Sequence, residues 1–313
     1  MRFYRNLLVA ALAAGLALAA GARAQESSKA AQAPPSPKAP PPPKADAKAT
    51  KVLDDAIKKL DPAKLGWVET SLWQRFDLQG LKVQSEGRYL AGPDYHLHVR
   101  LKVNLAGAVG SLESVCDGTT LWRVWDVPPP PDKEGAGRQV QKVDWKKVMD
   151  TLNRGGMPRQ VREMVLQRES FAGPAALLEA LRKGMTITGQ TKARWNGRDV
   201  TKLSAVWSPE TIKPTGLGNP PWPHVPHRCE IYLDRDTGWP YRLEAWGAVR
   251  PRAEDGLLVQ MEFRDPTFHK KLSPGRIARE FTFRPGTDDV ADKTDETVDG
   301  LKRLAEQKPR QKK

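Results

Sequence analysis

The chain has 313 residues, of which 39% are hydrophobic and 28% are charged. This composition is enough to bury one core, so a chain that is unfolded throughout is excluded, and a single β-rich domain of this size is ordinary. The formal net charge is +14, which favours anionic partners such as nucleic acid, acidic lipid headgroups or cell-wall polymers. The 27 prolines and the mean hydropathy of -0.58 indicate that part of the chain does not fold.

Residues 1–24 have the pattern of a secretory signal peptide. Arg2 and Arg5 precede an apolar run from Leu7 to Ala20, and Ala22-Arg23-Ala24 forms a small-x-small cleavage site. The apolar run is shorter than the about 20 residues that a membrane-spanning helix needs. The sequence therefore predicts a periplasmic or otherwise exported protein that is soluble after cleavage. An uncleaved signal that acts as a membrane anchor is the alternative.

Three further segments follow the signal peptide. Residues 25–46 are rich in Pro, Ala and Lys, which predicts a disordered linker. Residues 47–298 carry the periodic apolar pattern of one folded domain. Residues 299–313 are predicted to be a basic, disordered tail, since they contain many Lys and Arg residues and few apolar ones.

Helical periodicity is clearest from Asp144 to Met185, in the middle of the predicted domain. Apolar residues recur there at spacings of three and four, which predicts short helices with one apolar stripe. In the helix predicted over 174–183, that stripe is Leu177, Leu178 and Leu181. Another amphipathic helix is predicted from Ala47 to Leu60, where Pro62 ends it.

Runs of alternating apolar and polar residues on both sides of these helices predict two β-meanders. In the clearest strand, Tyr95, Leu97, Val99 and Leu101 face the core, and the histidines at 96 and 98 face solvent. Asp117-Gly118 and Asn196-Gly197 predict hairpin turns. The residues from Glu280 to Val290 are expected to form a short last strand.

The sequence predicts no enzyme, cofactor or metal site. Asp236-Thr237-Gly238 matches the short aspartic-protease signature, but that chemistry needs two carboxylates, and the single copy lies where a turn is expected. His224, His227 and Cys229 are close in sequence, but a proline-rich loop gives them no regular geometry for a metal ion. A nucleophile elbow, a phosphate-binding glycine loop and an HExxH motif are all missing from the sequence.

The two cysteines, Cys116 and Cys229, lie on predicted strands. Export permits a disulfide between them, which would stabilise the fold by about 4–5 kcal/mol in the chain-entropy model. Two buried free thiols are the alternative, because the sequence does not say whether the two strands are neighbours.

Several segments resemble the outer-membrane lipoprotein carrier (LolA-like) superfamily, in the pattern of its long, divergent members. LESVCDGTTLWRVW carries the DG…LW hairpin of that family, and CEIYLDRDTGWPYRLEAWG carries its Y-L-D…T-G-x-P-x-R hairpin. FAGPAALLEALRKG matches the helical insertion, and LVQMEFRDPTFHKKLSPGRIAREFTFRPGTDDVADKT matches the closing F-x-F-x-P and D-x-T pattern. The resemblance covers roughly residues 47–298. The linker, a proline loop after Pro209 and the basic tail depart from the family pattern, and no residue here corresponds to the carrier's lid-latching arginine.

The resemblance implies an α+β fold in which helices cover the concave face of a half-open antiparallel β-barrel. It also implies a non-enzymatic cell-envelope protein that binds lipid or lipoprotein acyl chains. The alternative is an envelope sensor or scaffold of the same fold that binds a protein partner, such as an envelope membrane protein. Nucleic acid is not an expected partner, since an exported protein rarely meets it. The candidate lining of the apolar cavity is Tyr95, Leu97, Val99, Leu101, Leu177, Leu178 and Leu181, although the same residues are also compatible with a filled core.

Overall fold

Alternating apolar and polar residues produce the strands, and the described strands all join one sheet. The computed structural model describes residues 44–78, 81–105, 107–126, 137–154, 157, 161–162, 165–166, 173–207, 226–248 and 255–306. The strands are β1 (Trp67–Leu78), β2 (Leu81–Ala91), β3 (His96–Leu105), β4 (Ala108–Asp117), β5 (Thr120–Asp126), β6 (Arg138–Asp144), β7 (Met185–Trp195), β8 (Arg198–Trp207), β9 (Arg228–Asp234), β10 (Pro240–Ala248), β11 (Asp255–His269) and β12 (Val290–Asp292). The helices are α2 (Ala47–Lys59), α3 (Pro62–Leu65), α4 (Trp145–Asn153), α6 (Gly173–Gly184), α8 (Pro274–Phe281) and α9 (Thr294–Glu306).

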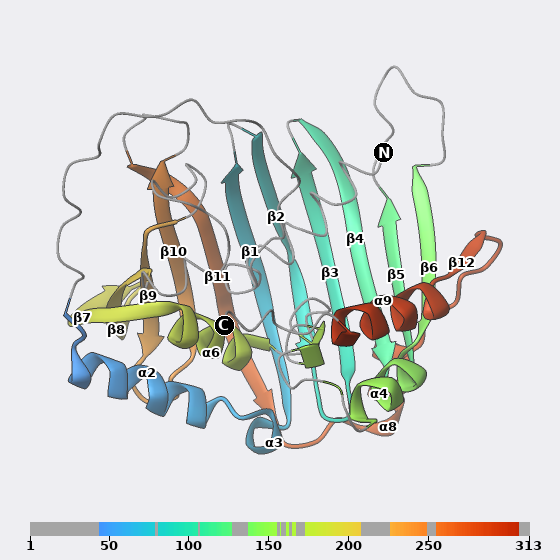
Figure 1. Ribbon diagram of the computed structural model, residues 1–313, viewed down its shortest axis with the longest axis horizontal. Coiled ribbons are helices and arrows are strands. Elements are labelled where there is room, and N and C mark those ends of the chain that lie inside the picture. The colour runs from blue at the N-terminus through green and yellow to red at the C-terminus, as the bar shows by residue number, and fades with distance from the viewer. Residues whose placement is uncertain are drawn as a thin grey trace.

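The sheet has the strand order β12-β6-β5-β4-β3-β2-β1-β11-β10-β9-β8-β7. Neighbouring strands are antiparallel, except that β12 runs parallel to β6. The two predicted meanders are β1–β6 and β7–β11, and the pairing of β1 with β11 joins them (Figure 1). The predicted turns Asp117-Gly118 and Asn196-Gly197 connect β4 to β5 and β7 to β8.

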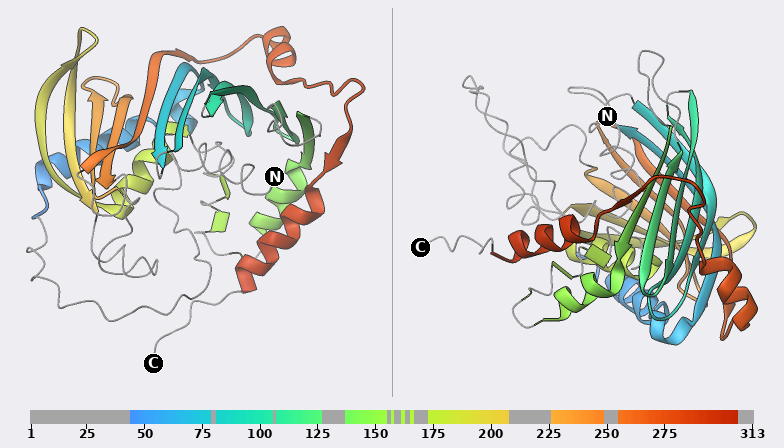
Figure 2. Two further views of the ribbon diagram at one scale, coloured as in Figure 1. Left: turned by 90° about the horizontal axis from the view of Figure 1, so that it is seen from above. Right: turned by 90° about the vertical axis from the view of Figure 1, so that its right-hand side faces the viewer.

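The sheet curves into an open half-barrel, and most of the helices lie on its concave side (Figure 2). There α2 and α6 cover the β7–β10 end, and α4 and α9 cover the β6 end. The concave face is apolar, because alternate residues of each strand point into it. On β3, for example, Leu97, Val99 and Leu101 are at most 1% exposed. The predicted α+β half-open barrel with helices on the concave face is confirmed.

One helix lies on the convex face, which the sequence analysis did not expect. Ser273 caps α8 by accepting a hydrogen bond from the Arg276 N–H at 3.3 Å, and Pro274 begins the helix. Phe281, at the end of α8, is buried against Trp67 and Leu90. The last strand predicted from Glu280 to Val290 is therefore wrong: α8 continues to Phe281, and strand pairing begins only at Val290.

Because α8 covers that part of the convex face, His98 is not a solvated histidine as predicted. Its Nε2 atom lies 3.0 Å from Glu113 Oε1, and its Nδ1 atom lies 3.6 Å from Glu280 Oε2. Arg88 joins the same group with a 2.6 Å hydrogen bond to Glu280. This hydrogen bond holds the pKa of Glu280 below its ordinary value, although partial burial opposes the effect.

The two ends of the predicted domain also need adjustment. Helix α9 crosses the boundary expected at residue 298 and runs to Glu306, because Val298 and Leu301 form a buried stripe on it. At the other end, Asp46 was assigned to the linker but caps α2, accepting hydrogen bonds from the N–H groups of Lys48 and Ala49. The predicted signal peptide, residues 25–43 of the linker and residues 307–313 of the tail lie outside the described residues.

Candidate functional site

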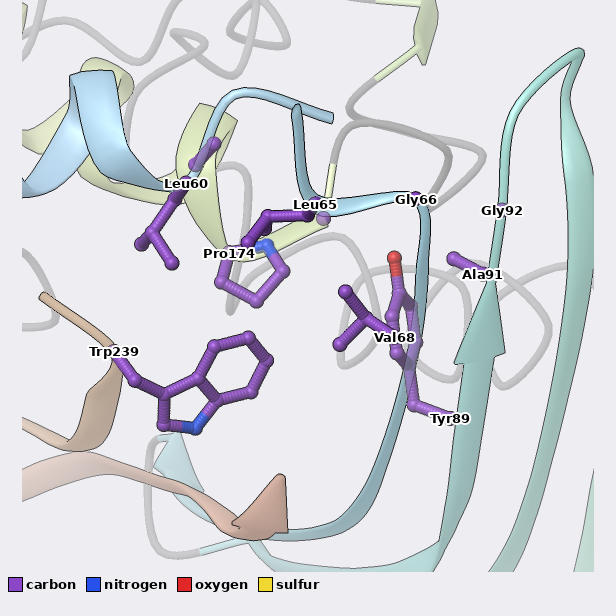
Figure 3. Close-up of a pocket in the computed structure, with 11 residues that line it drawn as sticks. Leu60, Leu65, Gly66, Val68, Tyr89, Ala91, Gly92, Pro174 and Trp239 are labelled. Carbon is purple, nitrogen blue, oxygen red and sulfur yellow. The ribbon is translucent and has the colours of Figure 1, made fainter. Parts of the chain in front are cut away.

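A small apolar pocket lies at one end of the sheet, under the first turn of α6 (Figure 3). Its volume is about 50 Å³. Segments far apart in the sequence contribute to it, namely the end of α2, α3, the first turn of α6 and the ends of β1, β2 and β10. The lining residues are Leu60, Leu65, Gly66, Val68, Tyr89, Ala91, Gly92, Gly173, Pro174, Ala175 and Trp239.

Glycines allow the chain to turn closely around this pocket. A Cβ atom on Gly92 would lie 2.2 Å from the Trp67 ring, so only glycine permits the packing there. Gly66 has a φ of +70°, and a Cβ atom on it would lie 2.8 Å from His269 O. Gly92 therefore brings the end of β2 against the start of β1, and Gly66 brings the start of β1 against the end of β11.

Two large aromatic residues, Tyr89 and Trp239, form a wall of the pocket, and neither side chain is charged. Trp239 is fully buried, and its indole N–H donates a 3.1 Å hydrogen bond to Phe263 O. Burial raises the pKa of Tyr89 well above its ordinary value, so its hydroxyl stays neutral. A Cβ atom on Gly173 would lie 3.0 Å from that hydroxyl, which places the start of α6 directly over Tyr89. The pocket therefore suits an apolar group.

Helix α6 is the predicted helix over 174–183, and it packs on α2 and on β7. The Arg182 Nε atom donates a 2.8 Å hydrogen bond to Asp54 of α2. Leu177, Leu178 and Leu181 are at most 3% exposed and belong to the same hydrophobic core as the α2 stripe. Only the first turn of α6, through Pro174 and Ala175, reaches the pocket.

The structure brings the predicted lining residues together, but it does not place them at the pocket. Leu97, Val99, Leu101 and the three α6 leucines share one hydrophobic core. Tyr95 lies in the turn before β3, with a φ of 61° and its ring 6.0 Å from that of Trp145. The residues that do line the pocket lie at or near the ends of helices and strands. Glycine and proline, which mark such ends, were the only sequence pattern that pointed to them.

The remaining predicted sites have plain structural roles. Cys116 and Cys229 are free, buried thiols, because five strands separate β4 from β9 in the sheet. Burial raises the pKa of Cys116 to about 12 and also raises that of Cys229, so neither is a reactive thiolate.

Asp236-Thr237-Gly238 forms the β9–β10 turn, as predicted. His227 pairs with Asp255 at 2.7 Å, whereas His224 lies outside the described residues.

A second, larger depression lies where α2 meets α6 and β7, with a volume of about 460 Å³. Lys51, Asp54, Arg182 and Lys183 are among its lining residues. The Asp54–Arg182 pair already occupies part of this wall, so the depression is less suited to an apolar ligand than the pocket under α6.

Among the described helices, none is long and apolar enough to cross a membrane.

No known family model matches this chain, and no curated protein matches it either. Solved structures with a similar fold include a MucA/MucB complex from Pseudomonas aeruginosa (14% identity, 74% of this chain, TM-score 0.35), and this chain spans only 60% of the matched chain. They also include LprF from Mycobacterium bovis (12% identity, 73% of this chain and 96% of that chain, TM-score 0.37). A third is a LolA superfamily protein from Nitrosomonas europaea (11% identity, 75% of this chain and 97% of that chain, TM-score 0.25).

The curved antiparallel sheet, the helical insertion between its two meanders and the order of the hairpin motifs match what the sequence resemblance implies. The fold is the half-open barrel that the LolA-like resemblance of the sequence implies. In this half-barrel, the described part of the concave side is largely filled by packed side chains, and the small pocket under α6 is a gap in that packing.

Proposed function

We propose that this chain is an exported, non-enzymatic protein of the cell envelope that binds a lipid or lipoprotein acyl chain under α6. The observation that carries the proposal is the pocket in Figure 3, where apolar groups from three helices and the sheet converge without a charged side chain. A hydrocarbon chain is the ligand that such a lining favours, since a polar ligand would lose its hydrogen bonds with water there.

The size of the pocket limits what the closed state holds. An apolar cavity of roughly 150 Å³ accommodates benzene, so a pocket of about 50 Å³ accepts only the end of a hydrocarbon chain. A longer chain needs the first turn of α6 to move away from Tyr89. That turn begins at Gly173, which has a φ of +57°. Glycine adopts this left-handed conformation without steric strain. The proposed protein therefore has two states. In the closed state, which is the one in this structure, α6 covers the pocket, and in the opened state the first turn of α6 has moved away and the ligand is bound.

A variant that fills the pocket tests this proposal. Ala175→Leu adds three carbon atoms to a side chain that is 7% exposed and lines the pocket. We expect binding of a fluorescent fatty-acid probe to weaken at least tenfold. The free energy of unfolding should change by no more than about 1 kcal/mol, because the added atoms enter an existing space. Probe titration and thermal melting measure the two effects.

Ala193→Leu is the matched control, since Ala193 packs on the same core from β7 but does not line the pocket. It should leave probe binding unchanged. Equal binding by wild type and Ala175→Leu would contradict the proposed location. A folded wild type that binds no probe would reject acyl-chain binding and favour the alternative, an envelope sensor or scaffold that binds a protein partner.

A further inference from the structure

Four segments meet at the end of the molecule that holds the pocket: the end of α2, α3, the β9–β10 turn and the connection from β11 to α8 (Figure 1). The close approach of Gly66 to the carbonyl oxygens of His269 and Lys270 joins the α3–β1 connection to the β11–α8 connection. Lys59 Nζ donates a 2.7 Å hydrogen bond to Asp236 O, which joins α2 to the β9–β10 turn. These segments therefore form one surface, which we call the basic end.

Several exposed lysines lie on the basic end. Lys270 and Lys271 are exposed and make no ion pair within the described part of the chain. The side chains of Lys58 and Lys64 are 76% and 70% exposed, and each lies 4.0 Å from its nearest carboxylate. Such long, exposed pairs leave most of the positive charge available to a partner. The acidic groups among these segments are Asp55, Asp61, Asp234 and Asp236, and the Asp234 carboxylate already accepts hydrogen bonds within the β9–β10 turn.

An aromatic side chain lies beside these cations. Phe268 is 38% exposed, and it and Val109 are the only large hydrophobic residues that are exposed in the described part of the chain. Its ring lies 5.4 Å from that of Trp239, a wall residue of the pocket. Lysines together with an exposed aromatic ring are typical of surfaces that lie at a membrane interface.

The pocket and the basic end share chain segments. Leu60, Leu65 and Gly66 line the pocket, and the cations Lys58, Lys59 and Lys64 belong to the same stretch of α2 and α3. A membrane that contacts these lysines would therefore lie next to the segments that line the pocket.

We propose that the basic end is a docking surface for an anionic lipid bilayer. The lysines contact the headgroups, Phe268 enters the interface, and the pocket under α6 faces the membrane. This inference rests on the proposed acyl-chain binding for its purpose, but its evidence is the separate arrangement of exposed charge and aromatic surface.

Vesicle binding by the mature chain tests the inference. Wild type should sediment with vesicles of 70% phosphatidylcholine and 30% phosphatidylglycerol at low salt, and not with pure phosphatidylcholine. Lys270→Gln with Lys271→Gln should weaken this binding roughly 25-fold, since each basic residue near an anionic membrane contributes about fivefold to the affinity. Added salt should abolish the binding by screening.

Lys82→Gln with Lys192→Gln is the matched control. Both lysines are exposed, make no ion pair among the described residues and lie on strands away from the basic end. Because the basic linker and tail are present in both double variants, any general attraction that they add is the same in each. The control should bind vesicles as wild type does.

Two results would overturn the docking surface. One is an equal loss of vesicle binding in both double variants. The other is a wild type that does not bind the anionic vesicles but binds an anionic polymer such as polyglutamate. Probe binding in the absence of vesicles separates the two proposals, because Lys270→Gln with Lys271→Gln should not change it. Probe binding without vesicle binding rejects only the docking surface, and vesicle binding without probe binding rejects only the acyl-chain pocket.

Discussion

At the scale of single residues, two aspartates organise the hairpin turns that the sequence motifs predict. The Asp234 carboxylate accepts hydrogen bonds from the N–H groups of Asp236 and Thr237, at 3.0 and 2.8 Å, and from the Thr237 hydroxyl at 2.9 Å. The Asp117 carboxylate likewise accepts hydrogen bonds from the N–H groups of Thr119 and Thr120 and from the Thr119 hydroxyl. Partial burial alone would raise the pKa of Asp234, but these hydrogen bonds outweigh it and hold the pKa below the ordinary value of 3.8.

Asp234→Ala should lower the free energy of unfolding by about 1–2 kcal/mol at neutral pH, because it removes three hydrogen bonds to a charged acceptor. A depressed folded-state pKa means that this stability is present above pH 3.8 and is lost as the pH falls through the lower folded-state value. The difference between wild type and variant should therefore shrink in acid. Denaturant titrations at pH 7 and at pH 3 measure it.

Asp236→Ala is the control in the same turn, since the Asp236 side chain is exposed and makes no hydrogen bond to another described residue. A loss of stability that is equal in the two variants, or that does not change with pH, would contradict this account of the turn.

The residue scale also shows what periodicity predicts and what it leaves out. It correctly assigned Leu97, Val99 and Leu101 to the buried face, because strand alternation alone decides which side of a sheet a residue faces. It did not find Tyr89 or Trp239 as pocket residues. Their positions depend on how the ends of separate elements meet, which no local pattern contains.

At the scale of elements, caps explain where the predicted boundaries fail. Asp46 was placed in the linker by composition, but it caps α2, and its N–H donates a 2.8 Å hydrogen bond to Ile187 O of β7. Similarly, Ser273 and Pro274 begin α8 within a segment where alternating phenylalanines predicted a strand. Short capped helices are difficult to predict because a few polar residues outweigh the apolar pattern around them.

Deletion of residues 25–43 should leave the melting temperature unchanged, because their Pro- and Lys-rich composition offers few core contacts. Deletion of residues 25–46 also removes the cap on α2 and the Asp46 hydrogen bond to β7. That should cost about 1 kcal/mol, or roughly 2–4 °C in a domain of this size. Equal melting temperatures for the two deletions would show that the cap is dispensable, and a fall of many degrees for the shorter one would show that the linker packs on the domain.

At the scale of the whole molecule, the order of motifs along the chain predicted the class of fold. The half-open sheet was expected from the resemblance of the two hairpins and the helical insertion. The pairing of β1 with β11 joins residues about 200 positions apart, such as Val68 and Phe268, and no hairpin signal indicates it. The placement of α8 on the convex face and the location of the pocket both follow from this long-range closure, so the sequence alone did not supply them.

The measurement that tests the acyl-chain proposal most directly is photolabelling with a fatty acid that carries a diazirine at its terminal carbon. Peptide mass spectrometry of the labelled wild type should place the adducts on the pocket segments, residues 60–68, 89–92 and 173–175, and Ala175→Leu should lose them. Adducts on the central core strand at residues 97–101, adducts scattered over the surface, or an unlabelled but folded chain would contradict the account.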